Sequence, residues 1–167
     1  KNEGVLKVIE SVLYLECPTD GDTTRVYDGT PLVPQVTAHV TSATTDEVTI
    51  TYSVDGGAWS TTPPSVTHVS EGTKTVKVRA VTTSQVMEEC QFTMHVTCRK
   101  DTLISADGGK TYDGEALTSE TVTMTGDGFL TAETPTFSNF ASLTNAGSVS
   151  NTFDYDFPSG VDESDYC

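Results

Sequence analysis

The chain has 167 residues, a formal net charge of −15 and an aromatic content of only 8%. So acidic a surface repels phosphate backbones and argues against nucleic-acid binding, and no stretch is apolar enough to insert into a membrane. The length favours one domain and allows two. The abundance of Thr, Ser, Val and Gly favours strands and turns over helices.

The first predicted element is an apolar strand at residues 3–9, EGVLKVI, whose apolar side chains are Val5, Leu6, Val8 and Ile9. Five later segments alternate apolar and polar residues with a period of two, as strands with one buried face do. They span residues 48–54, 75–81, 91–96, 121–124 and 152–157.

The inward faces of four of these segments can be listed from the alternation. They are Val48, Ile50, Tyr52 and Val54; Val76, Val78 and Ala80; Phe92, Met94 and Val96; and Phe153, Tyr155 and Phe157. Clusters of Gly, Pro and Asp separate the segments, and the one helical hint, at residues 84–90, is too short to form a stable helix. Asp55-Gly56 predicts a tight hairpin turn, and Trp59 is expected to anchor the core. The pattern predicts an all-β sandwich fold.

A motif recurs along the chain: residues 25–32 read RVYDGTPL and residues 110–117 read KTYDGEAL. A Gly turn followed by an alternating strand comes after each copy, at 71–81 and at 146–157. Such a period predicts two tandem immunoglobulin-like modules, at residues 10–98 and 99–167. The second module then lacks the final strand that QFTMHVT supplies to the first, and residues 1–9 are a spare strand of that final type.

These segments resemble the YDG/MBG-type repeats of bacterial surface adhesins, which are tandem immunoglobulin-like modules of long extracellular proteins. The resemblance rests on VYDGTPL, on YSVDGGAWSTTPPSVTHVSEGTKTVKVRA and on KTYDGEALTSETVTMTGDGF with the downstream LTNAGSVSNTFDYDF. It implies a secreted or cell-surface stalk or adhesin segment without catalytic activity. The cysteines depart from the pattern, because such repeats usually have none.

The two YDG motifs are interpreted as structural turns. In Tyr27-Asp28-Gly29 and Tyr112-Asp113-Gly114, we expect the Tyr ring to cover the core and the Asp to cap backbone N–H groups. Each Gly is expected to adopt a positive φ.

The four cysteines, Cys17, Cys90, Cys98 and Cys167, form no CxxC motif and lie at no zinc-ligand spacing from a histidine. In an acidic, Thr-rich chain they indicate disulfides and an oxidising, extracellular compartment. One arrangement pairs Cys17 with Cys98, leaving Cys90 and Cys167 for each other or for another subunit. The alternative pairs Cys98 with Cys167.

No constellation for catalysis is evident, so the protein is not expected to be an enzyme. No Ser or Cys lies in a GxSxG-type motif, and Asp154 and Asp156 share an outward strand face rather than a cleft. No cofactor is expected. Calcium at loop carboxylates is the alternative, and the candidate ligands are Asp20, Asp22, Asp28 and the tail residues Asp162, Glu163 and Asp165.

Two explanations account for the spare strand. The chain boundaries fall inside a longer repeat array, or residues 1–9 of one copy complete the second module of the next copy. Strand donation of this kind joins copies head to tail into an open fibre. We therefore expect a filament or stalk subunit that binds itself; the alternative is an adhesin segment whose loops bind a glycan or a host protein.

Overall fold

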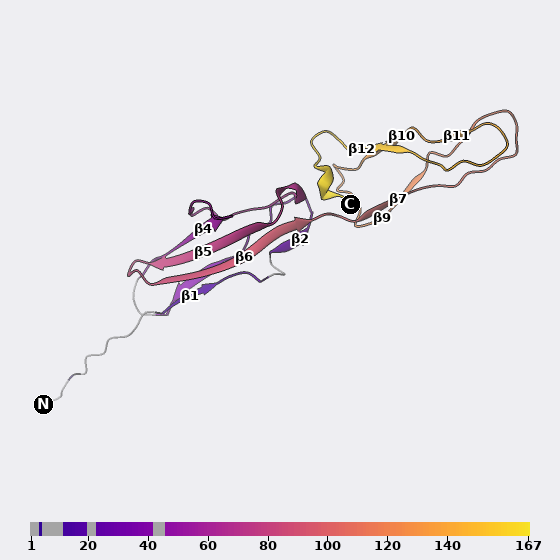
Figure 1. Cartoon of the computed structure of the whole chain (residues 1–167). Coiled ribbons are helices and arrows are strands. Elements are labelled where there is room, and N and C mark those ends of the chain that lie inside the picture. Colours follow the sequence, from indigo (N-terminus) through magenta and orange to yellow (C-terminus); the bar gives the residue numbers. More distant parts are fainter. Residues whose placement is uncertain (1–3, 5–11, 20–22, 42–45) are drawn as a thin grey trace. The chain divides into compact units, whose positions relative to one another are not determined.

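The computed structural model of the chain describes residues 4, 12–19, 23–41 and 46–167 (Figure 1). The prediction of an all-β fold is confirmed: β-strands make up the described elements, apart from the short 3₁₀ helices η2 (Val69–Glu71) and η3 (Glu163–Asp165). Among the described residues, no helix has the length and apolar character needed to cross a membrane.

The chain divides into two compact units. The first includes the described residues up to Arg25, together with Thr30–Thr67 and Glu71–Val96. The second includes Thr97–Cys167 and two short segments from earlier in the chain, Val26–Gly29 and His68–Ser70.

In the first unit, a four-stranded sheet has the order β2-β6-β5-β4, in which β6–β5 and β5–β4 are antiparallel, and a separate antiparallel pair joins β1 to β3. The strands are β1 (Leu13–Glu16), β2 (Thr24–Val26), β3 (Thr37–Val40), β4 (Val48–Val54), β5 (Lys74–Thr82) and β6 (Met87–Thr97). A disulfide between Cys17, directly after β1, and Cys90 in β6 ties the pair to the sheet.

The core of the first unit follows the predicted alternation on two neighbouring strands. The inward residues of β5 and β6 are all buried, and they are Val76, Val78, Ala80, Phe92, Met94 and Val96. Because β5 lies between β4 and β6, it is hydrogen-bonded along both edges and packs its apolar face fully.

In the second unit the strands are short and occur only in pairs. They are β7 (Asp101–Ser105), β8 (Leu117–Thr118), β9 (Val122–Gly126), β10 (Thr136–Ser138), β11 (Ser142–Leu143) and β12 (Asp154–Asp156). The antiparallel pairs are β7 with β9, β8 with β11, and β10 with β12.

Taken in chain order, the antiparallel pairs of the second unit can be matched to pairs of the first, apart from β2 and β6. The β1–β3 pair corresponds to β7–β9, and β4–β5 corresponds to β10–β12. The isolated bridge between Leu32 and Val66 corresponds to the pairing of Leu117 with Leu143. Residues 97–167, all of which the structure describes, contain no counterpart of β6, and residues 106–116, where the counterpart of its partner β2 is expected, form no strand.

The second unit buries far fewer side chains than the first. Within residues 97–167, Pro135 and Asp165 are the only buried residues. The prediction that Tyr155 points inward is wrong, because 52% of it is exposed. Phe153 and Phe157 on the same strand face are only half-buried, since no strand lies along the other edge of β12.

The local expectations for residues 53–60 have mixed outcomes. Asp55 and Gly56 form the predicted tight turn, with φ of 50° and 76°, and the Gly57 amide donates to the Val54 carbonyl at 2.8 Å. Positive φ at both central residues is the hallmark of a type I′ hairpin turn. Trp59 is not a core anchor: it is 41% exposed, and the Arg79 guanidinium lies over its ring, 4.4 Å from the centroid.

Candidate functional site

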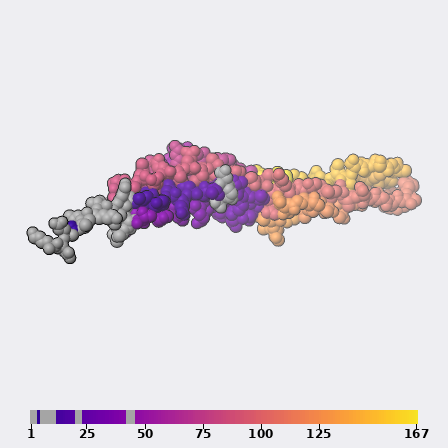
Figure 2. All heavy atoms as spheres, turned by 90° about the horizontal axis from the view of Figure 1, so that it is seen from below, coloured from indigo at the N-terminus to yellow at the C-terminus, as the bar shows by residue number. Residues whose placement is uncertain are grey.

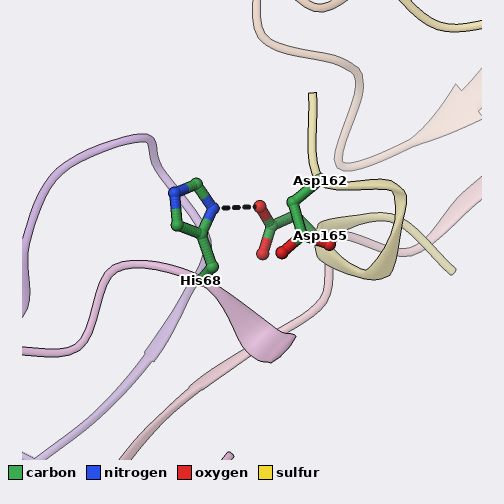
Figure 3. A group of neighbouring side chains, drawn as sticks. All are labelled: His68, Asp162 and Asp165. Atoms are coloured by element: carbon green, nitrogen blue, oxygen red, sulfur yellow. Dashed lines mark hydrogen bonds and ion pairs between the residues drawn. The ribbon is translucent and has the colours of Figure 1, made fainter. Parts of the chain in front are cut away.

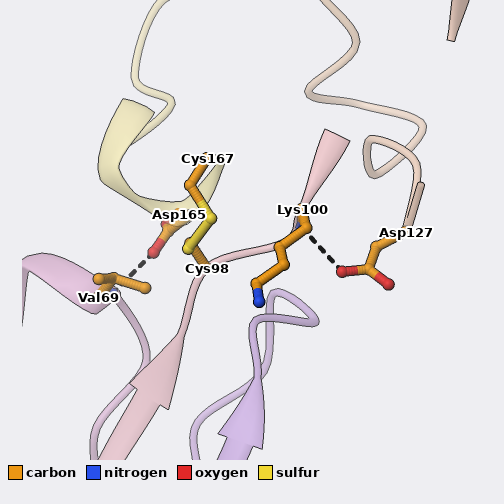
Figure 4. Close-up of a disulfide and its surroundings, with 6 residues drawn as sticks. All are labelled: Val69, Cys98, Lys100, Asp127, Asp165 and Cys167. Atoms are coloured by element: carbon orange, nitrogen blue, oxygen red, sulfur yellow. Dashed lines mark hydrogen bonds between the residues drawn. A yellow bond between two sulfur atoms is a disulfide. The ribbon is translucent and has the colours of Figure 1, made fainter. Parts of the chain in front are cut away.

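All four cysteines form disulfides, as expected, but the pairing of Cys17 with Cys98 is wrong. Cys17 bonds to Cys90, and Cys98 bonds to Cys167, which was the alternative for that pair. Cys98 directly follows β6 and lies beside the C-terminal residues of the second unit (Figure 4), whereas Cys17 directly follows β1 and meets Cys90 within the first unit. Next to Cys98, the Arg99 amide donates to the Asp165 carbonyl and the Cys167 amide donates to the Arg99 carbonyl, both at 2.8 Å.

The two YDG turns have the same backbone and different surroundings. Gly29 and Gly114 adopt φ of +79° and +85°, as predicted. Both aspartates are exposed, and the Asp113 carboxylate accepts the Glu115 amide at 3.0 Å and pairs with Lys110 at 2.7 Å. The Lys110 contact is the largest of several effects that hold the pKa of Asp113 below its usual value.

The tyrosines of the two turns differ most. Tyr27 is 3% exposed, in agreement with the expected position over a core, and Tyr112 is 66% exposed, which contradicts that expectation. The tyrosine ring of the motif is therefore buried in the first YDG turn and exposed to solvent in the second.

Tyr27 is held in the second unit by a group of residues that we call the tyrosine cup: Arg99, Phe129, Glu133, Phe157 and Tyr166. The Tyr27 hydroxyl donates to Glu133 Oε1 at 2.9 Å, and the Tyr166 hydroxyl donates to the other carboxylate oxygen at 2.6 Å. The Tyr27 ring meets the Tyr166 ring edge-on, and Phe129 and Phe157 pack against Tyr166.

Backbone contacts complete this cup. The Tyr27 amide donates to the Thr97 carbonyl at 2.8 Å, and Arg99 donates to the Tyr27 carbonyl at 3.0 Å. A Cβ added at Gly29 would come within 3.0 Å of the Leu130 side chain, so the turn fits closely. Burial, followed by the hydrogen bond to Glu133, raises the pKa of Tyr166 to about 12 and raises the pKa of Tyr27 for the same reasons.

A second set of contacts fastens residues 68–70 to the tail of the same unit (Figure 3). The fully buried Asp165 carboxylate lies 2.6 Å from His68 Nδ1 and accepts the Val69 amide at 2.8 Å. Asp162 accepts the hydroxyls of Ser164 and Ser70, contacts that lower its pKa. Figure 4 shows the Val69 contact beside the Cys98–Cys167 disulfide and the contact of the Lys100 amide with Asp127.

The structure brings two of the calcium candidates together. Ligand atoms of His68, Asp162 and Asp165 lie within 4.8 Å of one another. The oxygens of both carboxylates already accept hydrogen bonds, so the group acts as a fastening for residues 68–70. Glu163 is exposed beside it, and Asp20 and Asp22 lie outside the described residues.

The second unit has a hollow of about 420 Å³. One wall comes from residues 107–112 and the other from residues 143–151. Figure 2 shows these two stretches, separated by some 35 residues of sequence, on the surface of the second unit. Leu117, Leu143 and Val149 give the hollow an apolar lining, and Asn151 fixes its floor by donating to the carbonyls of Ala106 and Ser119.

The predicted donor residues Val5, Leu6, Val8 and Ile9 lie outside the described residues. Glu133, Arg99 and His68 were not predicted as site residues. Glu133 and Tyr27 are 106 residues apart, and no local pattern marks a single carboxylate as the acceptor for a distant tyrosine.

Comparisons of the chain with family models, with curated proteins and with solved structures find no match.

Proposed function

We propose that the protein is an extracellular structural subunit of two immunoglobulin-like modules. Its copies join head to tail when residues 3–9 of one copy occupy the open position beside β12 of another. The proposal rests on β6. This strand lies between β2 and β5 in the first unit, and residues 97–167 form no strand like it.

The strand position matters energetically because β6 supplies a large part of the buried apolar face in the first unit. Phe92, Met94 and Val96 are buried on it, and each such side chain contributes about 1.5–3 kcal/mol. In the second unit, the strand that we match to β5 is β12. Tyr155 at its centre is exposed, and the flanking Phe153 and Phe157 are only half-buried. An added strand would bury these rings and satisfy the free edge of β12.

Residues 3–9 suit that position by sequence. Leu6 and Val8 can face the core, and the intervening Lys7 then faces outward. The outward face of β12 carries Asp154 and Asp156. At the corresponding place in the first unit, Arg79 of β5 pairs with Glu89 of β6 at 2.6 Å, so an opposite-charge pair across this edge has a precedent within the molecule.

The two disulfides support an extracellular location, because such bonds persist in oxidising compartments. The acidic surface keeps a long assembly soluble and limits lateral association.

The test is assembly of the purified chain, followed by negative-stain microscopy and sedimentation velocity. We expect filaments or linear oligomers from the full chain and monomers from a variant lacking residues 1–11. A matched control, Lys7→Ala, keeps the apolar face and should reduce assembly only slightly, whereas Leu6→Asp with Val8→Asp should abolish it.

Two outcomes would overturn the proposal. The full chain stays monomeric at high concentration, or filaments persist without residues 1–11. Binding of a glycan by a monomer that never assembles would favour the adhesin alternative instead.

A further inference from the structure

We infer that His68, Asp162 and Asp165 form a binding site for a zinc-class divalent metal ion, beyond the structural role proposed above. All three residues belong to the second unit, and ligand atoms of the three lie within 4.8 Å of one another. The set combines an imidazole nitrogen with two carboxylates. Such a site is independent of head-to-tail assembly, because all of its ligands lie in the same chain.

Local structure directs the two carboxylates to the same side of the chain. Asp162 is the N-cap of η3, and Asp165 is the last residue of that helix, three positions later. A 3₁₀ helix has three residues per turn, so side chains three positions apart lie one above the other. His68 directly precedes η2 and turns its Nδ1 atom towards Asp165 (Figure 3). The three side chains therefore converge on one point.

Each carboxylate is anchored to the backbone through one of its oxygens. Asp165 Oδ1 accepts the Val69 amide at 2.8 Å, and Asp162 Oδ1 accepts an amide of η3 at 3.1 Å. The Oδ2 atoms meet side chains instead, His68 for Asp165 and the Ser70 hydroxyl for Asp162. Hydrogen bonds to one oxygen are what orient a ligating carboxylate. A metal ion can thus replace the side-chain contacts of Oδ2, while the contacts of Oδ1 keep both carboxylates in place.

Burial and charge favour a divalent ion at this point. The Asp165 side chain is 0% exposed, and a buried carboxylate is costly unless a cation or hydrogen-bond donors compensate its charge. One divalent ion neutralises the two carboxylates together.

The site needs only a small movement of the histidine. His68 Nδ1 and Asp165 Oδ2 are 2.6 Å apart, and two ligands of one tetrahedral zinc ion are about 3.3 Å apart. The His68 side chain is 40% exposed, so its ring has room to move by this difference. With Nδ1 on the metal, the hydrogen of the neutral ring is on Nε2.

The donor set selects zinc over calcium or magnesium. Zinc takes imidazole nitrogen and carboxylate oxygen at about 2.0–2.2 Å, and three protein ligands leave a fourth position for water. Calcium takes roughly six to eight oxygens, and magnesium requires an octahedron of oxygens. Two carboxylates and an imidazole supply too few oxygens for either ion.

The test is zinc binding by the full chain, purified without a metal-affinity tag and stripped with EDTA. Isothermal titration calorimetry should give one zinc ion per chain. With free zinc at about a hundred times its Kd, amide exchange of residues 68–70 and 162–167 should slow by up to about a hundredfold. Calcium and magnesium at the same concentration should leave this exchange unchanged.

His68→Ala and Asp162→Asn should each weaken zinc binding by about tenfold or more. Asp162→Asn is the sharper variant, because asparagine caps a helix as well as aspartate does and only the charge is lost. His39→Ala changes an exposed histidine of β3 and is the matched control, which should bind zinc as the unchanged chain does. Absence of zinc binding, unchanged affinity in Asp162→Asn, or loss of binding in His39→Ala would overturn the metal site.

Discussion

Strand β5 of the first unit and strand β12 of the second differ in length, in pairing and in burial. β5 is nine residues long, paired on both edges, and its inward residues Val76, Val78 and Ala80 are completely buried. β12 is three residues long, paired on one edge, and Tyr155 at its centre is half exposed. The difference shows that the alternating sequence alone does not bury a strand face: a neighbouring strand must cover it.

The largest contrast expected between the units concerns their disulfides. Cys17–Cys90 and Cys98–Cys167 close loops of 73 and 69 residues, so each should stabilise its unit by roughly 4 kcal/mol in the chain-entropy account. Cys98→Ala with Cys167→Ala should unfold the second unit of the monomer, because little apolar burial remains there. Cys17→Ala with Cys90→Ala should leave the first unit folded. Hydrogen exchange with mass spectrometry would separate the two, and equal tolerance in both units would break the contrast.

Two methionines provide a matched test of packing. Met94 on β6 is fully buried, and Met124 on β9 is 44% exposed. Met94→Ala should lower the free energy of unfolding by about 2–5 kcal/mol, and Met124→Ala should change it by less than about 0.5 kcal/mol in the monomer. Denaturant titrations of both variants without residues 1–11 give these values. Similar losses would mean that the second unit has a core after all.

The two YDG tyrosines sharpen the comparison at a smaller scale. Tyr27→Phe removes the hydrogen bond to Glu133 and should destabilise the second unit by about 1–2 kcal/mol. In the same monomeric background, Tyr112→Phe should have no measurable effect, since the ring is exposed. Thermal unfolding checks both. A loss for Tyr112→Phe would show that its turn is already held within the monomer.

The tyrosine cup also predicts a modest pH dependence. The pKa of Tyr166 in the folded chain, about 12, exceeds its value of about 10 in an unfolded chain. The stabilisation is therefore complete below pH 10 and is lost as the pH rises toward 12, by about 1 kcal/mol at pH 11. Tyr166→Phe should reduce this dependence for the amides of the second unit, and Tyr27, whose pKa is also raised, should account for what remains. Tyr52 in the first unit, whose pKa burial also raises, makes unit-resolved exchange the suitable readout.

The sequence predicts the fold class and most of the first unit, because alternation on β5 and β6 directly encodes a buried face. It also locates the YDG turns, since Gly at a positive φ is a local requirement. It misplaces Trp59, Tyr112 and Tyr155, which are aromatic residues whose burial depends on neighbours distant in sequence. The same limit explains the wrong Cys17–Cys98 pairing and the missed role of Glu133: side-chain contacts across some 70–106 residues leave no periodic trace.

The most direct test of the open strand position is amide hydrogen exchange along residues 153–157, in the full chain and in the variant lacking residues 1–11. If residues 3–9 of another copy pair with β12, exchange in this segment should slow at least tenfold in the full chain at assembling concentrations, and dilution should reverse the change. Equal exchange in the two proteins, with filaments present, would contradict the account.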